Sequence, residues 1–251
     1  PVAREIAEDI NAKIGQGVPG NTALISIDGG SGSGKTTITE EVSKYLSEEH
    51  GFECVVIGMD LTLKNREWRI AVEKLVTGMK LSEKEEALVG DLKNQIKPRE
   101  PYLDEEEMFF DNPKTLGLVK EVDEWRRSDS QSHDLTVPDA YIRGEAERKT
   151  AKFPLKKGMV IIFDGKYANR KELQGYYDLR YRLHDAPDRT AARFEIRSRT
   201  LNPNDADMHI VFYKMSMVPC YELYDSRTEG RIHGFIDLRG EDWYMKRSPS
   251  D

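Results

Sequence analysis

A glycine-rich stretch at residues 29–36, with the sequence GGSGSGKT, constrains the fold of this chain more than any other feature. It matches the phosphate-binding pattern G-x-x-x-x-G-K-[ST] at every fixed position. A short apolar run precedes it, and residues 37–46 after it place Ile38, Val42 and Tyr45 at helical spacing. Strand, glycine loop and helix are the context that this pattern requires, so we expect a nucleoside triphosphate site. A flexible linker is the alternative, but linkers lack the Lys-Thr pair and the buried strand.

The residues of the loop have separable roles in holding a triphosphate. The glycines allow backbone N–H groups to turn inward around the phosphates, and the start of the following helix adds positive potential. Lys35 is expected to reach the β- and γ-phosphates, and the Thr36 hydroxyl to ligate Mg²⁺. We therefore predict ATP and Mg²⁺ as cofactors, with the nucleotide bound by Gly30, Ser31, Gly32, Ser33, Gly34, Lys35, Thr36 and Thr37.

Composition favours a cytoplasmic protein without a membrane or nucleic-acid partner. The chain has 251 residues, enough for one substantial core, and no apolar run long enough to span a bilayer. Its two cysteines, Cys54 and Cys220, lack metal-ligand spacing and suit a reducing compartment. The formal net charge of -7 opposes non-specific attraction to nucleic acid. Association into a homo-oligomer is left open.

Apolar runs alternate with helical patterns along the chain, which predicts a three-layer α/β fold with a mainly parallel sheet of about five strands. After the strand before the loop, we expect strands at 54–59, 159–163, 179–183 and 235–238. We interpret residues 1–251 as a single P-loop domain with three further parts. These are a leading helix and turn at 1–20, a substrate-side insertion at about 61–158, and a lid with following helices at about 187–233.

The insertion at 61–158 is strongly charged and carries several prolines, and we interpret it as helices and loops. Within it, residues 80–97 are predicted to form one solvated helix. Several aromatic residues could stack on an acceptor ring, although packing in the core is their more common role: Tyr102, Phe109, Phe110, Trp125 and Tyr141. One or two of its arginines could bind an anionic acceptor, and spacing does not choose among Arg66, Arg69, Arg126, Arg127, Arg143 and Arg148.

Carboxylates follow two of the predicted strands, at the end of an open α/β sheet where ligands bind. Asp164 comes after a run of large apolar residues, the pattern of an acid that holds Mg²⁺ directly or through water. Asp60 closes the strand at 54–59 and could accept a proton from an attacking hydroxyl. Each residue could instead cap a helix or a turn.

Arginines recur every four residues at Arg189, Arg193 and Arg197, which would form one basic stripe on a helix. An arginine lid that closes over the phosphates would neutralise charge on the γ-phosphoryl group during its transfer. The alternative is a solvated helix face with Glu195 as partner, and the stripe alone favours this alternative. The five histidines are scattered without metal spacing, so none is assigned a catalytic or zinc-binding role.

The order and spacing of these motifs resemble those of the uridine kinase and phosphoribulokinase family over about residues 22–240. The matching segments are the glycine loop, Asp60, Phe-Asp-Asn-Pro at 110–113, Phe-Asp-Gly at 163–165, Asp-Ala-Pro-Asp at 185–188, Val-Pro at 218–219, and 235–240. The resemblance implies ATP-dependent phosphorylation of a hydroxyl on a small molecule. It also implies Asp60 as the base, Asp111 beside Phe110 as a partner for acceptor hydroxyls, and Arg193 and Arg197 as lid residues.

The chain departs from this family at residues that concern the acceptor. Asn112 stands where uridine kinases usually have His, Asp164 replaces the usual Glu, and Phe212 stands where a Gln reads uracil. The Arg-Gly-Arg of the pyrimidine-handling lid has no counterpart near residues 201–207. We therefore expect a nucleoside, sugar or polyol acceptor without specifying uridine. Asp111 could equally be the N-cap of a helix.

Two other functional classes remain open at this point. The chain could be a regulatory nucleotide-binding protein that hydrolyses its nucleotide slowly, or a kinase that acts on a nucleotide within nucleic acid. The acidic net charge weakens the second of these alternatives. The large substrate-side insertion favours the small-molecule kinase over both, because a nucleotide switch has no acceptor to bind.

Overall fold

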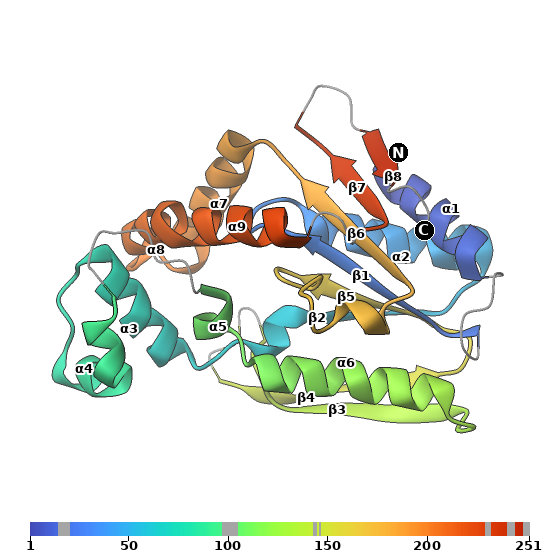
Figure 1. Ribbon diagram of the computed structural model, residues 1–251, viewed down its shortest axis with the longest axis horizontal. Helices are drawn as coiled ribbons and strands as arrows, with labels where there is room; N and C mark the ends of the chain where they lie inside the picture. Colours follow the sequence, from blue (N-terminus) through green and yellow to red (C-terminus); the bar gives the residue numbers. More distant parts are fainter. Residues whose placement is uncertain are drawn as a thin grey trace.

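A computed structural model of the chain describes residues 1–14, 21–96, 105–142, 145, 147–228, 232–239 and 244–247 (Figure 1). Some of the predictions above concern residues outside these ranges. They are the turn at 15–20, the aromatic side chain of Tyr102, the basic side chain of Arg143 and the last residue of the segment 235–240.

A six-stranded sheet with the order β2-β5-β1-β6-β7-β8 forms the middle layer. Its strands are β2 (Cys54–Gly58), β5 (Val160–Gly165), β1 (Ala23–Gly29), β6 (Leu179–His184), β7 (Gly234–Asp237) and β8 (Tyr244–Arg247). The first five are parallel, and β8 pairs antiparallel with β7. Every residue of β1 and β5 is buried, as expected for strands covered on both faces. The predicted parallel sheet is confirmed, with β8 as an additional edge strand.

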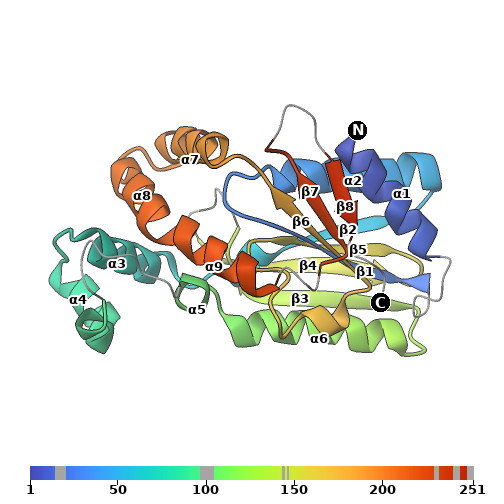
Figure 2. The same ribbon diagram turned by 45° about the horizontal axis from the view of Figure 1, so that its top comes forward.

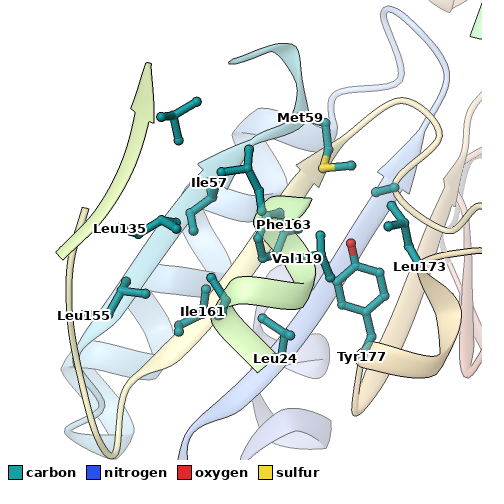
Figure 3. Close-up of a cluster of buried hydrophobic side chains, with 14 of the residues drawn as sticks. Leu24, Ile57, Met59, Val119, Leu135, Leu155, Ile161, Phe163, Leu173 and Tyr177 are labelled. Atoms are coloured by element: carbon teal, nitrogen blue, oxygen red, sulfur yellow. The ribbon is translucent and has the colours of Figure 1, made fainter. Parts of the chain in front are cut away.

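Helices cover both faces of this sheet and complete the three layers. On one face lie α1 (Val2–Ile14) and α2 (Lys35–His50), and on the other lies α6 (Asn112–Arg127) (Figures 1 and 2). Figure 3 shows the apolar cluster under α6, where Val119 of the helix meets Leu24, Ile161 and Phe163 of the sheet. A second cluster joins α1 and α2 to the opposite face. The prediction of a three-layer α/β fold is therefore confirmed.

A β-hairpin lies beside α6, formed by β3 (Ser132–Ala140) and β4 (Lys149–Lys156). Leu135 and Leu155 extend from it into the cluster shared by α6 and the sheet (Figure 3). The prediction that the insertion contains only helices and loops is wrong here. Both strands carry polar and charged residues on their exposed side and contain a proline, Pro138 or Pro154, which disguises the usual strand pattern.

Short helices form the rest of the insertion, namely η2 (Met59–Thr62), α3 (Arg66–Thr77), α4 (Glu83–Val89), η3 (Gly90–Asn94) and α5 (Glu105–Phe109). The single helix predicted at 80–97 is wrong. The Ser82 side chain caps the start of α4, and Gly90 ends it with a φ of +48°, a conformation that favours glycine. This segment also buries Leu81, Val89 and Leu92, so it is only partly solvated.

After β5 come the short η4 (Gln174–Tyr176) and then, after β6, a series of helices. They are α7 (Pro187–Leu201), α8 (Ala206–Phe212), the π-helical η5 (Tyr213–Met217) and α9 (Val218–Thr228). Helix α8 contacts both α7 and α3, so the predicted lid meets the substrate-side insertion (Figure 2). Within the described ranges, no helix combines the length and apolarity needed to cross a bilayer.

Candidate functional site

The glycine loop lies between the end of β1 and the start of α2, at the carboxyl end of the parallel strands. This is the strand, loop and helix context that the sequence predicted. Gly32 and Gly34 have φ values of +85° and +82°, in the left-handed region that glycine adopts without strain. Gly34 is also the N-cap of α2. The loop therefore opens a helix whose N-terminus can bind phosphate.

Helix α7 touches the backbone of this loop directly. A Cβ atom placed on Gly32 would lie 2.5 Å from the carbonyl oxygen of Thr190, closer than real side chains approach. From the same helix, Nη1 of Arg193 donates to the carbonyl oxygen of Gly32 over 2.9 Å and to Oδ2 of Asp185 over 2.5 Å. Arg193 thus lies beside the phosphate loop, with its guanidinium held by two protein oxygens.

Lys35, the first residue of α2, carries a half-buried ammonium side chain. Its Nζ donates to the carbonyl oxygen of Gly30 over 3.3 Å. Burial lowers the pKa of Lys35, the carboxylates of Asp164 and Asp60 raise it, and the charge of Arg197 lowers it further. The pKa is therefore lowered from its usual range overall, because the loss of hydration outweighs the attraction of the two carboxylates.

Asp60 and Asp164 come together at the ends of neighbouring strands. Gly58 of β2 is paired with Asp164 of β5, and Asp60 lies two residues further along, in η2. Both carboxylates line one cavity with Lys35 and Thr36. The fold thus gathers a carboxylate suited to proton transfer, the half-buried cation of Lys35 and a hydroxyl around one cavity.

Magnesium fits the oxygen donors of this cavity. Mg²⁺ in phosphate-transfer sites is held by one or two protein oxygens and completed by phosphate and water, and Thr36 and Asp164 provide such oxygens at the loop. The described residues contain no cluster of three or more His, Cys, Asp or Glu side chains arranged for a metal.

A second cavity, of about 170 Å³, shares Lys35 and Asp60 with the first. We call it the acceptor-side cavity, and its wall includes residues of α3, α5, α7 and α8. Arg197 lines it from α7, with its guanidinium carbon 5.1 Å from the centre of the Phe194 ring. Phe110 also lines it and packs edge-on against Tyr167. Of the predicted residues, Lys35 and Asp60 therefore line both cavities, Thr36 and Asp164 line the first, and Phe110 and Arg197 line the second.

Asp111 has a structural role at the start of α6. Its Oδ1 accepts a hydrogen bond from the backbone N–H of Lys114 over 3.1 Å, so it is the N-cap of the helix. Its neighbour Phe110 lines the acceptor-side cavity, whereas Asp111 is not among the described residues that line either cavity. The capping role foreseen as an alternative is thus present, and a contact with acceptor hydroxyls stays a prediction.

Two buried ion pairs in the wall of the acceptor-side cavity were not predicted from the sequence. Nζ of Lys166 contacts Glu105, which also accepts a hydrogen bond from the hydroxyl of Tyr167. Nδ1 of His209 contacts Glu73. Both pairs join residues far apart in the chain, so no local spacing could have indicated them.

Asp28, immediately before the loop, is a fully buried carboxylate in β1. Arg182 forms an ion pair with it over 3.3 Å, and neither side chain is exposed. The hydroxyls of Tyr221 and Tyr224 donate to it over 3.1 Å and 2.5 Å. Burial, followed by the charge of Asp28, raises the pKa of both tyrosines well above its usual value. A buried charge with this many partners favours one fixed arrangement of the side chains next to the loop.

The parallel sheet, the helices on both of its faces and the glycine loop at its carboxyl end define a three-layer α/β protein with a P-loop fold. Solved structures support this class. The chain is similar to D-glycerate 3-kinase from Cryptococcus neoformans, with a TM-score of 0.60 and 12% identity over 98% of this chain and 99% of that one. It is also similar to a structure described as a possible uridine kinase from Bacillus stearothermophilus, with a TM-score of 0.55 and 17% identity over 90% and 93%.

These identities are low, so the similarity establishes the fold and leaves the substrate to the chemistry of the site. No protein-family model and no curated protein sequence matches the chain. The expected resemblance to uridine kinases is therefore confirmed at the level of the fold.

Proposed function

We propose that this protein is an ATP-dependent kinase that transfers the γ-phosphoryl group to a hydroxyl of a small molecule. The observation that carries this proposal is that Lys35 and Asp60 line both cavities. One cavity holds the residues suited to phosphate and metal, and the other opens toward the substrate-side insertion. A nucleotide switch has no need of a second cavity beside its phosphate-binding lysine. A kinase needs one, because its acceptor must reach the γ-phosphorus.

In the proposed reaction the acceptor hydroxyl attacks the γ-phosphorus of ATP. The new bond joins the acceptor oxygen to phosphorus, the bond to the oxygen that bridges the β- and γ-phosphorus atoms breaks, and ADP leaves. Asp60 accepts the hydroxyl proton, and Lys35 neutralises charge on the β- and γ-phosphates. Arg197 faces the same reaction from the lid helix. Thr36 and Asp164 would hold Mg²⁺, which supplies further neutralisation of phosphate charge when bound.

The structural neighbours support the reaction class without fixing the substrate. One is named a glycerate kinase and the other a possible uridine kinase, so each is named for the phosphorylation of a small hydroxyl-bearing molecule. Uracil recognition is not carried over to this chain, because Phe212, which stands where the resemblance places a uracil-reading Gln, is buried in the apolar cluster around Phe109. We therefore propose the kinase chemistry and place the acceptor in the cavity that Asp60 lines.

Acceptor-dependent release of ADP tests this proposal. The purified protein is incubated with ATP and Mg²⁺ and with each member of a panel of nucleosides, sugars, polyols and hydroxy acids. We expect at least one compound to raise ADP release well above the rate without acceptor, with a phosphorylated product visible by mass spectrometry. Stimulation by a protein or nucleic acid, and by none of the small molecules, would instead identify a regulatory nucleotide hydrolase or a nucleic-acid kinase.

A further inference from the structure

The acceptor-side cavity carries an arginine on its wall, away from the glycine loop. Arg69 of α3 lines this cavity together with Leu63 and Tyr141. Its Nε donates to the carbonyl oxygen of Lys64 over 3.0 Å, and its guanidinium carbon lies 4.8 Å from the centre of the Tyr141 ring. These two contacts hold the guanidinium at the wall. Within the described part of the chain, they leave Nη1 and Nη2 of Arg69 without a protein acceptor.

Other charged side chains of the same wall have partners of opposite charge. Lys166 contacts Glu105, and His209 contacts Glu73. The residues assigned above to phosphoryl transfer form a separate group beside the loop. Arg69 differs from all of these, because no described carboxylate lies within ion-pair distance of it. Among the described residues, Arg69 therefore gives the acceptor-side cavity a cation without a paired carboxylate, at a point where no phosphate of ATP is expected.

The surroundings of Arg69 strengthen its preference for an anion. Leu63, Phe110 and Tyr141 give this part of the wall an apolar surface, and Arg69 itself is only partly exposed. A charge pair is worth more beside apolar surface than in bulk water, because the effective dielectric constant is lower. The planar guanidinium can present two parallel N–H groups, which match the paired oxygens of a carboxylate or phosphate.

The size of the cavity limits the ligand further. Its volume of about 170 Å³ is close to that of the roughly 150 Å³ cavities that accommodate a benzene molecule. This suits an acceptor with roughly three to six carbon atoms better than a complete nucleoside, which has both a base and a ribose. The cavity thus favours a compact molecule that can contact Asp60 and Arg69 at the same time.

We propose that the acceptor is a compact hydroxyl-bearing anion, which presents its hydroxyl to Asp60 and its carboxylate or phosphate group to Arg69. This inference rests on the kinase function proposed above and names the substrate class of the same site. Arg69 is a substrate-binding residue in this arrangement. It selects the acceptor by charge, while Asp60 performs the proton transfer.

Matched pairs of acceptors test the inference on the unmodified protein. The pairs are glycerate and glycerol, gluconate and glucitol, and ribose 5-phosphate and ribose, so that each anion is compared with a neutral molecule of the same carbon skeleton. We expect at least one anion to have a kcat/KM at least about tenfold above that of its neutral partner, the effect of about 1.4 kcal/mol of extra binding. Whether the carboxylates or the phosphate ester respond identifies the anionic group.

Substitution of Arg69 tests the residue itself. Arg69→Met keeps most of the side-chain length and removes the charge. It should raise the KM of the preferred anion roughly 10- to 100-fold, as expected for losing a charged hydrogen bond. The KM for ATP and the kcat should change little, and Arg69→Lys should recover part of the affinity. Arg66→Met is the matched control, because Arg66 is an exposed arginine one turn earlier on α3 that contacts Asn202 over 3.2 Å.

The inference is overturned if the neutral member of every pair is phosphorylated at least as well as the anion, or if Arg69→Met and Arg66→Met behave alike. In either case, phosphorylation of any small acceptor would still support the proposed kinase function. The kinase function itself fails if ATP binds and no acceptor stimulates ADP release. If Arg69→Met does not fold, the comparison of anions with neutral partners on the parent protein decides the question alone.

Discussion

Asp60 is the residue whose loss should separate phosphoryl transfer from nucleotide binding. Asp60→Asn keeps the size of the side chain and removes its ability to accept a proton. We expect ATP affinity to remain nearly intact and kcat to fall by about two to four orders of magnitude, the usual span for a general base. Isothermal titration with ATP and steady-state ADP release measure the two quantities. Activity equal to that of the parent would move the base to Asp111 or Asp164.

Asp111 allows a second test at the scale of one residue, because asparagine and alanine affect a helix cap differently. Asparagine is as good an N-cap as aspartate, whereas alanine costs about 0.5–2 kcal/mol. We expect Asp111→Ala to lower the free energy of unfolding by this amount and Asp111→Asn to leave it nearly unchanged, both measured in urea. A raised acceptor KM in Asp111→Asn, with unchanged stability, would show that the carboxylate also binds acceptor hydroxyls.

The residues that sequence patterns could identify are those whose role follows from local context. The glycine loop is one continuous motif, and Asp60 and Asp164 each follow an apolar strand. Their meeting beside Lys35 follows from the parallel sheet alone. Arg69 could be named only as one of six arginines, because the lack of a nearby carboxylate among the described residues depends on the fold around it. The pairing of Glu73 with His209 joins two helices that are far apart in the sequence, so no local spacing predicts it.

At the scale of helices and strands, the contact between Glu73 and His209 joins α3 to α8. Burial lowers the pKa of His209, and so does the charge of Arg66. The hydrogen bond and charge of Glu73, with the charge of Asp205, raise it by more, so the pKa of His209 is raised above 6.5. A raised pKa in the folded state stabilises the protein fully below the unfolded value. This contribution is lost as the pH rises through the folded value.

We therefore expect the urea midpoint of the parent protein to fall as the pH rises above 6.5 and through the raised pKa of folded His209, where the imidazole loses its proton. In His209→Gln this component of the pH dependence should disappear. Glu73→Gln and the double variant complete a mutant cycle, in which coupling present at low pH should vanish at high pH. Identical pH profiles in the parent and His209→Gln would show that the pair contributes nothing to joining the two helices.

Elements buried on both sides were the easiest to predict. β1 and β5 are continuous apolar runs, because no face of either strand meets water. The strands β3 and β4 form a separate hairpin with one exposed face, and their charged and proline residues resemble a loop. β8 is a four-residue edge strand, too short to stand out from its sequence. The charged residues at 80–97 favour one continuous solvated helix, but Gly90 ends α4 inside this segment.

At the scale of the whole molecule, nucleotide binding should stabilise the fold. A ligand at 100 times its Kd adds about 2.7 kcal/mol to the free energy of unfolding. For a domain of this size each kcal/mol is worth about 2–4 °C in Tm, so we expect ATP with Mg²⁺ to raise Tm by about 5–11 °C. Differential scanning fluorimetry measures this shift. Lys35→Ala removes the cation at the phosphates and should abolish most of it, while an unchanged Tm in the parent would contradict the nucleotide site.

Helix α7 rests on Gly32 without space for a side chain, and the same helix carries Arg193 and Arg197. A larger residue at position 32, or a displaced α7, would disturb the partner across this contact. Substitutions in the loop and in α7 must therefore compensate each other at this contact. Helix α3 lines the acceptor-side cavity with Arg69 and Glu73, and none of its described hydrogen bonds goes to the loop backbone. Substitutions on α3 can therefore reshape this cavity without altering the contact between α7 and the loop.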